Sequence, residues 1–262
     1  MDTHGGQQRQ HPVSDPGCSG TDVPGPSDPD GHPDTGLFRV RGRNLGGGRR
    51  NSDPDEPRRD GRATTVCVVR HGETDWNVAG RLQGREDIPL NAHGREQARL
   101  TGQALAVAGW EVVLTSPLRR AAETARIIAD VASVPRVVEI ADLVERDYGV
   151  ASGLTRAQKQ ARFADGVVPG EESRASARDR SLAVLVSWAS RHPGGRILVV
   201  THGGVIGALL TALSGGAIAV APGSLGNGCV NVLHHVDGGW RVVTHNVVDH
   251  LVAARQGGAD TD

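Results

Sequence analysis

The feature that most constrains this chain is the near absence of apolar side chains from its first 62 residues. Residues 1–62 contain only eight apolar side chains, no alanine, and eight of the chain's 14 prolines. Such a segment cannot bury enough apolar surface to offset roughly 1–2 kcal/mol of backbone entropy per residue. We therefore expect a disordered Pro/Gly-rich N-terminal extension over 1–62, one catalytic domain over 63–253 and a flexible tail over 254–262.

The composition of the other 200 residues is that of one ordinary globular domain. They are about 45% apolar and carry 20 basic and 20 acidic side chains. This charge balance gives no general attraction to nucleic acid or to an anionic membrane. The longest apolar runs are far shorter than the ~20 residues that span a bilayer, and the N-terminus does not resemble a secretory signal. We expect a cytoplasmic protein with no nucleic-acid or membrane partner.

Strand and helix patterns alternate along this domain. Buried-strand patterns fall at 64–69, 111–115, 136–140 and 196–200. Helical patterns fall at 92–108, from an N-cap at Ser116 with Pro117 in the first turn to about 132, from Thr155 onward, at 171–191 and at 203–213. Two further strands, 229–236 and 240–245, flank a turn at 237–239 and predict a β-hairpin. The fold class expected is α/β, a three-layer α/β/α sandwich with a mostly parallel sheet and an antiparallel edge.

Polar residues follow three of these strands directly. The strand at 64–69 leads into Arg70 and His71, the strand at 111–115 leads towards Arg120, and the strand at 196–200 leads into His202 and Gly203. In open α/β sheets, ligands bind at the carboxyl ends of the strands, so these side chains should meet at one edge. Arginine matches phosphate geometry, a neutral histidine can act as a nucleophile, and helix N-terminal amides attract anions.

Each of these signals also has a plainer interpretation. A single histidine at a strand end is more often structural, and an arginine pair in a first helical turn is often a solvated face. Their coincidence at one edge of one expected sheet is what favours phosphoryl chemistry.

These motifs resemble those of the histidine phosphatase superfamily, in its phosphoglycerate-mutase-like branch. The resemblance covers residues 64–251 and rests on four stretches: Arg70-His71-Gly72-Glu73-Thr74, Ser116-Pro117-Leu118-Arg119-Arg120, Glu145-Arg146-Asp147-Tyr148-Gly149 and Thr201-His202-Gly203-Gly204. It implies a phosphoglycerate-mutase-like fold and a phosphomonoester hydrolase that acts through a phosphohistidine, without metal or cofactor.

The resemblance also implies a role for each matched residue. His71 would be the nucleophile and Glu145 the general acid and base, while Arg70, Arg120 and His202 would stabilise the transferring phosphate. Asn77, Gln83 and Gly84 would line the substrate mouth, and Gly203 would bind substrate at the start of its helix.

The reaction itself is left with alternatives. Only 56 residues separate Glu145 from His202, too few for the long basic insertion of the mutases, so hydrolysis of a small phosphorylated metabolite is favoured. A cofactor-dependent phosphoglycerate-type mutase is the first alternative, and a non-catalytic phospholigand-binding protein is the second. The stretch from Tyr148 to Glu172 holds few charges, which hints at a small or moderately polar substrate. A homodimer is left open.

Overall fold

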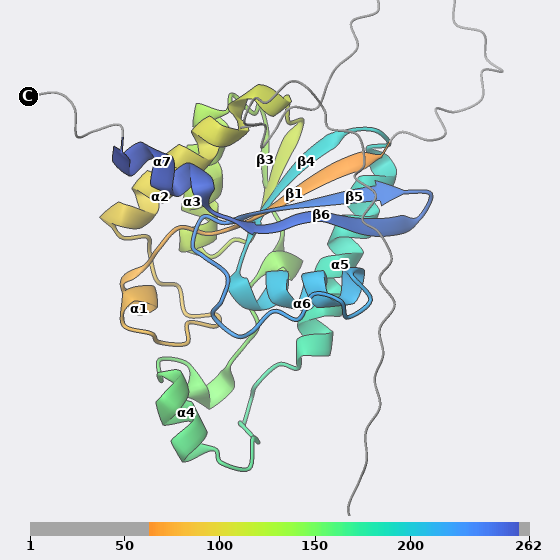
Figure 1. Cartoon of the computed structure of the whole chain (residues 1–262). Helices are drawn as coiled ribbons and strands as arrows, with labels where there is room; N and C mark the ends of the chain where they lie inside the picture. The colour runs from red at the N-terminus through yellow and green to blue at the C-terminus, as the bar shows by residue number, and fades with distance from the viewer. Residues whose placement is uncertain (1–62, 257–262) are drawn as a thin grey trace, which may run out of the picture. The chain divides into compact units, whose positions relative to one another are not determined.

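The computed structural model describes residues 63–256, which build one six-stranded sheet covered by helices (Figure 1). The strands are β1 (Thr64–Arg70), β2 (Val112–Thr115), β3 (Val137–Glu139), β4 (Arg196–Thr201), β5 (Val230–Val236) and β6 (Gly239–Val247). The helices are α1 (Asp75–Val78), α2 (Ala92–Leu105), α3 (Arg119–Val131), α4 (Arg156–Arg162), α5 (Arg174–Arg191), α6 (Gly203–Leu213) and α7 (Asp249–Gln256). Three 3₁₀ turns are η1 (Ala106–Ala108), η2 (Ala141–Leu143) and η3 (Gly149–Ala151).

The sheet has the mixed topology expected from the sequence. Its strand order is β3-β2-β4-β1-β5-β6. The first four strands in this order pair in parallel, and β5 and β6 are antiparallel. Figure 1 shows α2, α3 and α7 together on one side of the sheet and α5 and α6 on the other. The predicted fold class is therefore confirmed.

Strands β1 and β4 lie in the middle of the sheet and are covered on both faces. The run from Val66 to Val69 is at most 1% exposed, as is the run from Ile197 to Val200. Strands buried on both faces are continuous apolar runs because neither face meets water. This burial fixes β1 and β4 side by side and so fixes the place where their last residues emerge.

The hairpin of β5 and β6 closes the antiparallel edge. Its turn residues Asp237 and Gly238 have φ angles of 49° and 77°. Consecutive positive φ angles match the twist of two-residue hairpin turns, and Asp and Gly tolerate them. The predicted hairpin is present, and β6 is two residues longer than its expected end at 245.

The expected start of one helix was wrong, and another helix was not expected. Helix α3 begins at Arg119 with Leu118 as its N-cap residue, so Ser116 is not the N-cap and Pro117 lies outside the helix. Leu118 has ψ 131°, an extended conformation that delays the helix by two residues. Helix α7, from Asp249 to Gln256, had no counterpart among the expected elements. The prediction for residues 1–62 lies outside the described residues, as does most of the predicted tail at 254–262.

Candidate active site

The register of the central strands brings the predicted residues to one edge of the sheet. Arg70 pairs with Thr201 across β1 and β4, so His71 and His202 follow at the same level. Their ring centroids are 5.2 Å apart. Beside them lies a pocket of about 600 Å³. Its lining includes eight predicted site residues: Arg70, His71, Asn77, Gln83, Gly84, Arg120, Glu145 and Gly203.

His71 is buried, and one of its ring nitrogens is committed to the backbone. Its Nδ1 lies 2.7 Å from the carbonyl oxygen of Gly72, which can only accept a hydrogen bond, so Nδ1 carries the proton. In the neutral ring, Nε2 is then unprotonated. Burial lowers the pKa of His71 well below its usual range, and the nearby cations Arg120 and Arg70 lower it further. His71 is thus a neutral imidazole with a free Nε2 lone pair at pH 7.

Two arginines lie next to His71, Arg120 fully buried and Arg70 partly buried. Arg120 is fully buried at the start of α3, and its terminal nitrogens donate to the carbonyl oxygens of Glu86 at 2.6 Å and Gly84 at 2.8 Å. Arg70 donates to the carbonyl oxygen of Leu225. Burial lowers the pKa of Arg120 to about 10, so it remains a cation at neutral pH. Burial also lowers the pKa of Arg70. Both guanidinium groups are held in place by backbone oxygens.

His202 is oriented by Ser116, a contact that the sequence reasoning missed. The hydroxyl of Ser116 lies 2.8 Å from His202 Nε2, and it accepts a weaker bond from the amide of Leu118 at 3.3 Å. When the hydroxyl donates to Nε2, the proton of the neutral ring is on Nδ1. Burial, with Arg120 as the next cause, lowers the pKa of His202 well below its usual range, so the ring is neutral. Ser116 was read as a helix cap, which hid this role.

Three buried donors in this cluster have no hydrogen-bond partner within residues 63–256. They are Arg70 Nε, Arg120 Nε and His202 Nδ1. A buried donor without a partner is costly, roughly 1–3 kcal/mol, and in native proteins such atoms commonly mark functional sites. A phosphoryl group bonded to His71 Nε2 would present acceptor oxygens to this cluster. The arrangement is therefore suited to an anion that carries several oxygens.

Glu145 occupies the other wall of the pocket and is only 7% exposed. Its two carboxylate oxygens accept the amides of Gly204 at 3.0 Å and Val205 at 3.2 Å, at the N-terminus of α6. A Cβ on Gly204 would lie 2.6 Å from Glu145 Oε1, so only glycine leaves room for the carboxylate. Gly204 therefore makes room for the Glu145 side chain at the start of α6.

Gly72 packs closely against a neighbouring helix. A Cβ at Gly72 would lie 2.2 Å from the carbonyl oxygen of Gly94 in α2. The glycine therefore allows the loop after β1 to pack on α2. This packing fixes the loop that carries His71.

The predicted mouth residues form the near side of the pocket. Asn77 caps the turn at Thr74 through reciprocal side-chain and backbone bonds, and its Oδ1 also accepts Asn227 Nδ2 at 3.2 Å. Asn227 Nδ2 lies 3.1 Å from the carbonyl oxygen of His71, so it braces the backbone at that residue. Gly84 has a φ of 52° and supplies a carbonyl to Arg120. Asn227 was not among the predicted site residues, although it lines the pocket.

The pocket is more basic than the sequence suggested. Four further arginines line it, namely Arg81, Arg146, Arg156 and Arg174, and Glu145 is its single acidic lining residue among those described. Arg146 is neutralised by Glu171 at 2.7 Å. The other three have no ion-pair partner in the described part of the chain. Arg156 was read as an exposed helical residue, and it is exposed, but it also borders the pocket.

Two absences within residues 63–256 concern metal binding and membrane insertion. Between residues 63 and 256, no three or more His, Cys, Asp or Glu side chains are grouped as a metal ion would require. No helix in that range combines the length and apolar character needed to cross a membrane.

Comparisons with known proteins agree with this geometry. The family model described as "Histidine phosphatase superfamily (branch 1)" matches residues 66–248. The chain is 40% identical to "Uncharacterized phosphatase PhoE" of Bacillus subtilis (72% of this chain, 97% of that protein). It is 39% identical to "Metal-independent phosphoserine phosphatase" of Arabidopsis thaliana (76% and 89%). It is also 37% identical to "Probable phosphoglycerate mutase GpmB" of Serratia proteamaculans (71% and 94%).

A solved structure shows the same likeness in three dimensions. The vanadate complex of mycobacterial glucosyl-3-phosphoglycerate phosphatase Rv2419c matches with a TM-score of 0.63 and 29% identity, over 71% of this chain and all of that one. The expected enzyme class, a phosphomonoester hydrolase, is thus confirmed, and the chain belongs to the histidine phosphatase superfamily.

Proposed function

We propose that this phosphatase hydrolyses a small phosphomonoester without metal, through a phosphohistidine on His71. The observation that carries the proposal is the neutral His71 with its free Nε2 beside three unpartnered buried donors. A free lone pair is what attack on phosphorus needs, and fixed cations and donors stabilise the charge that spreads over the phosphoryl oxygens.

The reaction takes place in two steps. His71 Nε2 attacks phosphorus, a nitrogen–phosphorus bond forms, and the ester bond to the leaving oxygen breaks while Glu145 gives that oxygen its proton. Water then attacks phosphorus, Glu145 takes a proton from this water, and the nitrogen–phosphorus bond breaks to release inorganic phosphate. The carboxyl proton is restored at the end of the cycle.

The same proposal extends to the chemical class of the substrate. Arg81, Arg156 and Arg174 line the pocket without ion-pair partners in residues 63–256, at the mouth beyond the two arginines next to His71. We infer that the substrate carries a second anionic group, a carboxylate or another phosphate. Two of the proteins matched above are named as phosphatases of phosphoserine and of glucosyl-3-phosphoglycerate. Both compounds carry a carboxylate.

The test of the reaction is direct. Phosphate release from p-nitrophenyl phosphate should persist in EDTA, and enzyme quenched during turnover in an alkaline denaturant, in which the nitrogen–phosphorus bond is stable, should hold phosphate on histidine. His71→Ala should lower the rate by at least about 10³-fold, because the nucleophile is lost. Binding of vanadate without any turnover would instead support the non-catalytic phospholigand-binding alternative.

The test of the substrate class uses pairs of phosphomonoesters. kcat/KM for 3-phosphoglycerate and phosphoserine should exceed that for glycerol phosphate. Arg156→Gln and Arg174→Gln should each lower kcat/KM for the carboxylate substrates about tenfold and leave glycerol phosphate nearly unchanged. Arg119→Gln, outside the pocket lining, is the matched control. Equal losses on both kinds of substrate would contradict the second anionic group.

The mutase alternative is favoured by the same arginines, because a bisphosphorylated ligand also needs many cations. It predicts that phosphate moves between positions of phosphoglycerate faster than it is released. The ratio of isomerised product to inorganic phosphate, followed by NMR, decides between transfer to water and transfer to a second hydroxyl.

A further inference from the structure

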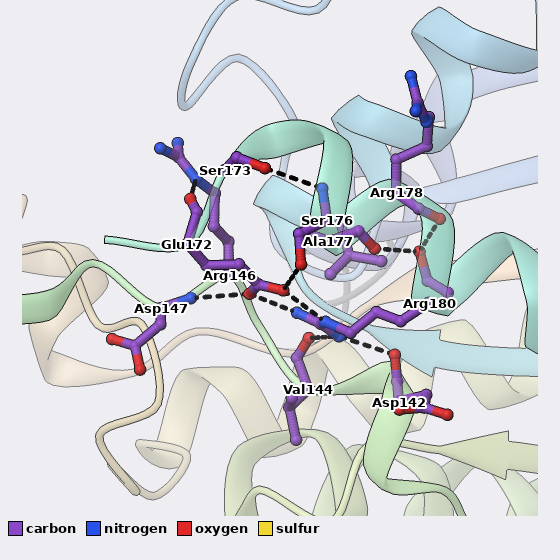
Figure 2. Close-up of polar contacts among 12 residues, drawn as sticks. Asp142, Val144, Arg146, Asp147, Glu172, Ser173, Ser176, Ala177, Arg178 and Arg180 are labelled. Carbon is purple, nitrogen blue, oxygen red and sulfur yellow. Dashed lines mark hydrogen bonds and ion pairs between the residues drawn. The ribbon is translucent and has the colours of Figure 1, made fainter. Parts of the chain in front are cut away.

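A partly buried ion pair lies behind Glu145, outside the pocket. Glu172 precedes α5 and Arg180 lies within it. Figure 2 shows their side chains meeting next to Val144, Arg146 and Asp147, the neighbours of Glu145 in the sequence. Arg180 Nε is 2.9 Å from Glu172 Oε1, and one terminal nitrogen is 2.9 Å from Oε2. The side chains are 15% and 10% exposed. We call this bidentate pair of Glu172 and Arg180 the clamp.

The remaining donors of Arg180 all bind the backbone around Glu145. They reach the carbonyl oxygens of Asp142 at 2.7 Å, Val144 at 2.7 Å and Glu145 itself at 3.2 Å. A guanidinium has five N–H donors in a fixed planar fork. Here all five have acceptors, two on Glu172 and three on this segment.

Glu172 holds the other side of the same segment. Its Oε2 accepts the amide of Asp147 at 3.2 Å, and its Oε1 accepts the hydroxyl of Ser176 at 3.0 Å. Its backbone carbonyl accepts Arg146 Nε at 2.5 Å. The clamp therefore grips the chain on both sides of Glu145.

The segment needs such support because it has little regular structure of its own. The turn η2 ends at Leu143, and residues 144–147 belong to no helix or strand. The carboxylate of Glu145 nevertheless has to lie at the N-terminus of α6, 3.0 Å from the amide of Gly204. A misplacement of about 1 Å in a catalytic group can cost about 100-fold in rate.

We propose that Glu172 and Arg180 are positioning residues that hold the Glu145 carboxyl where it protonates the leaving oxygen. Neither residue lines the pocket, so they act through Glu145 and touch no substrate. The inference rests on the proposed function, since it requires Glu145 to be the acid.

The experiment compares leaving groups. p-Nitrophenolate leaves without a proton, whereas an alkoxide such as that of glycerol phosphate needs one, and kcat/KM reports the steps up to its departure. Arg180→Gln and Glu172→Gln should lower kcat/KM for glycerol phosphate about 10- to 100-fold and that for p-nitrophenyl phosphate less than about threefold. Glu145→Gln should give the same selective pattern. Arg180→Lys should restore little, because an ammonium cannot make the five-donor fork.

Arg178→Gln is the matched control on the same helix, because Arg178 forms an exposed pair with Asp179. It should leave both substrates unchanged. A purely structural role for the clamp would lower both substrates equally with the amount of folded enzyme, measured by circular dichroism. If Arg180→Gln does not fold, Glu172→Gln decides, because its amide keeps the shape of the carboxylate.

The outcomes separate the two proposals. A selective loss in Glu145→Gln with wild-type selectivity in the clamp variants overturns the positioning role alone. No selective loss in Glu145→Gln overturns the acid role and the clamp together. Full activity in His71→Ala would overturn the proposed function itself.

Discussion

At the scale of single residues, the hydrogen-bond partners of two histidine rings decide which ring nitrogen is left for a ligand. His71 keeps its proton on Nδ1 because a carbonyl oxygen accepts it, and this leaves Nε2 for attack. His202 carries its proton on the same nitrogen, Nδ1, but here Nε2 contacts the protein, at the Ser116 hydroxyl, and Nδ1 is left to donate to a ligand. One backbone oxygen and one serine hydroxyl thus turn two identical side chains into a nucleophile and a hydrogen-bond donor.

Ser116→Ala should therefore impair catalysis without touching substrate. Without the hydroxyl, the proton of neutral His202 is free to sit on either nitrogen, and a donor to the phosphoryl group is lost part of the time. We expect kcat/KM to fall about tenfold, equivalent to roughly 1.4 kcal/mol, with little change in Tm. Ser187→Ala on the surface of α5 is the control. Wild-type kinetics in Ser116→Ala would show that the serine does not orient His202.

The low pKa of His71 gives a second prediction at this scale. Burial, Arg120 and Arg70 all favour the neutral ring, and only the bond to Gly72 favours the charged ring. The ring should remain neutral as the pH falls through 6.5, where an ordinary histidine is half protonated. A ¹⁵N NMR titration should show Nε2 of His71 unprotonated at pH 6. A titration midpoint at or above 6.5 would contradict the assignment.

At the scale of elements, local sequence signals predicted what local interactions determine. The capping box of Thr155 and Gln158 begins α4 as expected, because its two bonds lie within one turn of chain. The predicted start of α3 was wrong because the Ser116 hydroxyl, expected to cap that helix, contacts His202, which lies 86 residues away in the sequence. The clamp could not be predicted for the same reason. Its partners come from two segments that only the fold brings together, and α5 would look the same with Arg180 in solvent.

The clamp also predicts how the α5 region responds to acid. The bonds from Arg180, Ser176 and the Asp147 amide lower the pKa of Glu172 to about 2, from an ordinary value near 4.5. Arg85 also faces the Glu172 carboxylate at 3.5 Å and pairs with Asp147 as well. Burial of the Glu172 carboxylate acts in the other direction and raises its pKa. A depressed pKa stabilises the fold above the unfolded-state value, and this stabilisation is lost as the pH falls towards 2.

The free energy of unfolding should therefore fall more steeply in the wild type than in Glu172→Gln between about pH 4.5 and pH 2. Above this window, the difference between the two proteins should be constant. Urea unfolding followed by circular dichroism at a series of pH values measures both slopes. Asp179→Asn, which removes an exposed ion pair, should change the slope less, because water screens that pair. Parallel slopes for wild type and Glu172→Gln would contradict the pKa assignment.

At the scale of the whole molecule, many short segments contribute residues to the site, and all these segments lie within one domain-sized stretch of the sequence. The residues that line the pocket run from Arg70 to Asn227, and the family model matches residues 66–248. Strand β1 begins at Thr64, supplies Arg70 and leads directly into His71.

A shortened chain that begins at Arg62 should therefore be a complete enzyme. We expect its kcat/KM to lie within about twofold of the full chain's, because every lining residue and both central strands are retained. The measurement uses p-nitrophenyl phosphate and a carboxylate-bearing phosphomonoester side by side, with Tm recorded for both chains. A loss on both substrates at unchanged Tm would mean that residues 1–62 contribute to catalysis. A loss on the carboxylate substrate alone would place part of its recognition in those residues, and either result would contradict a site built wholly within 63–256.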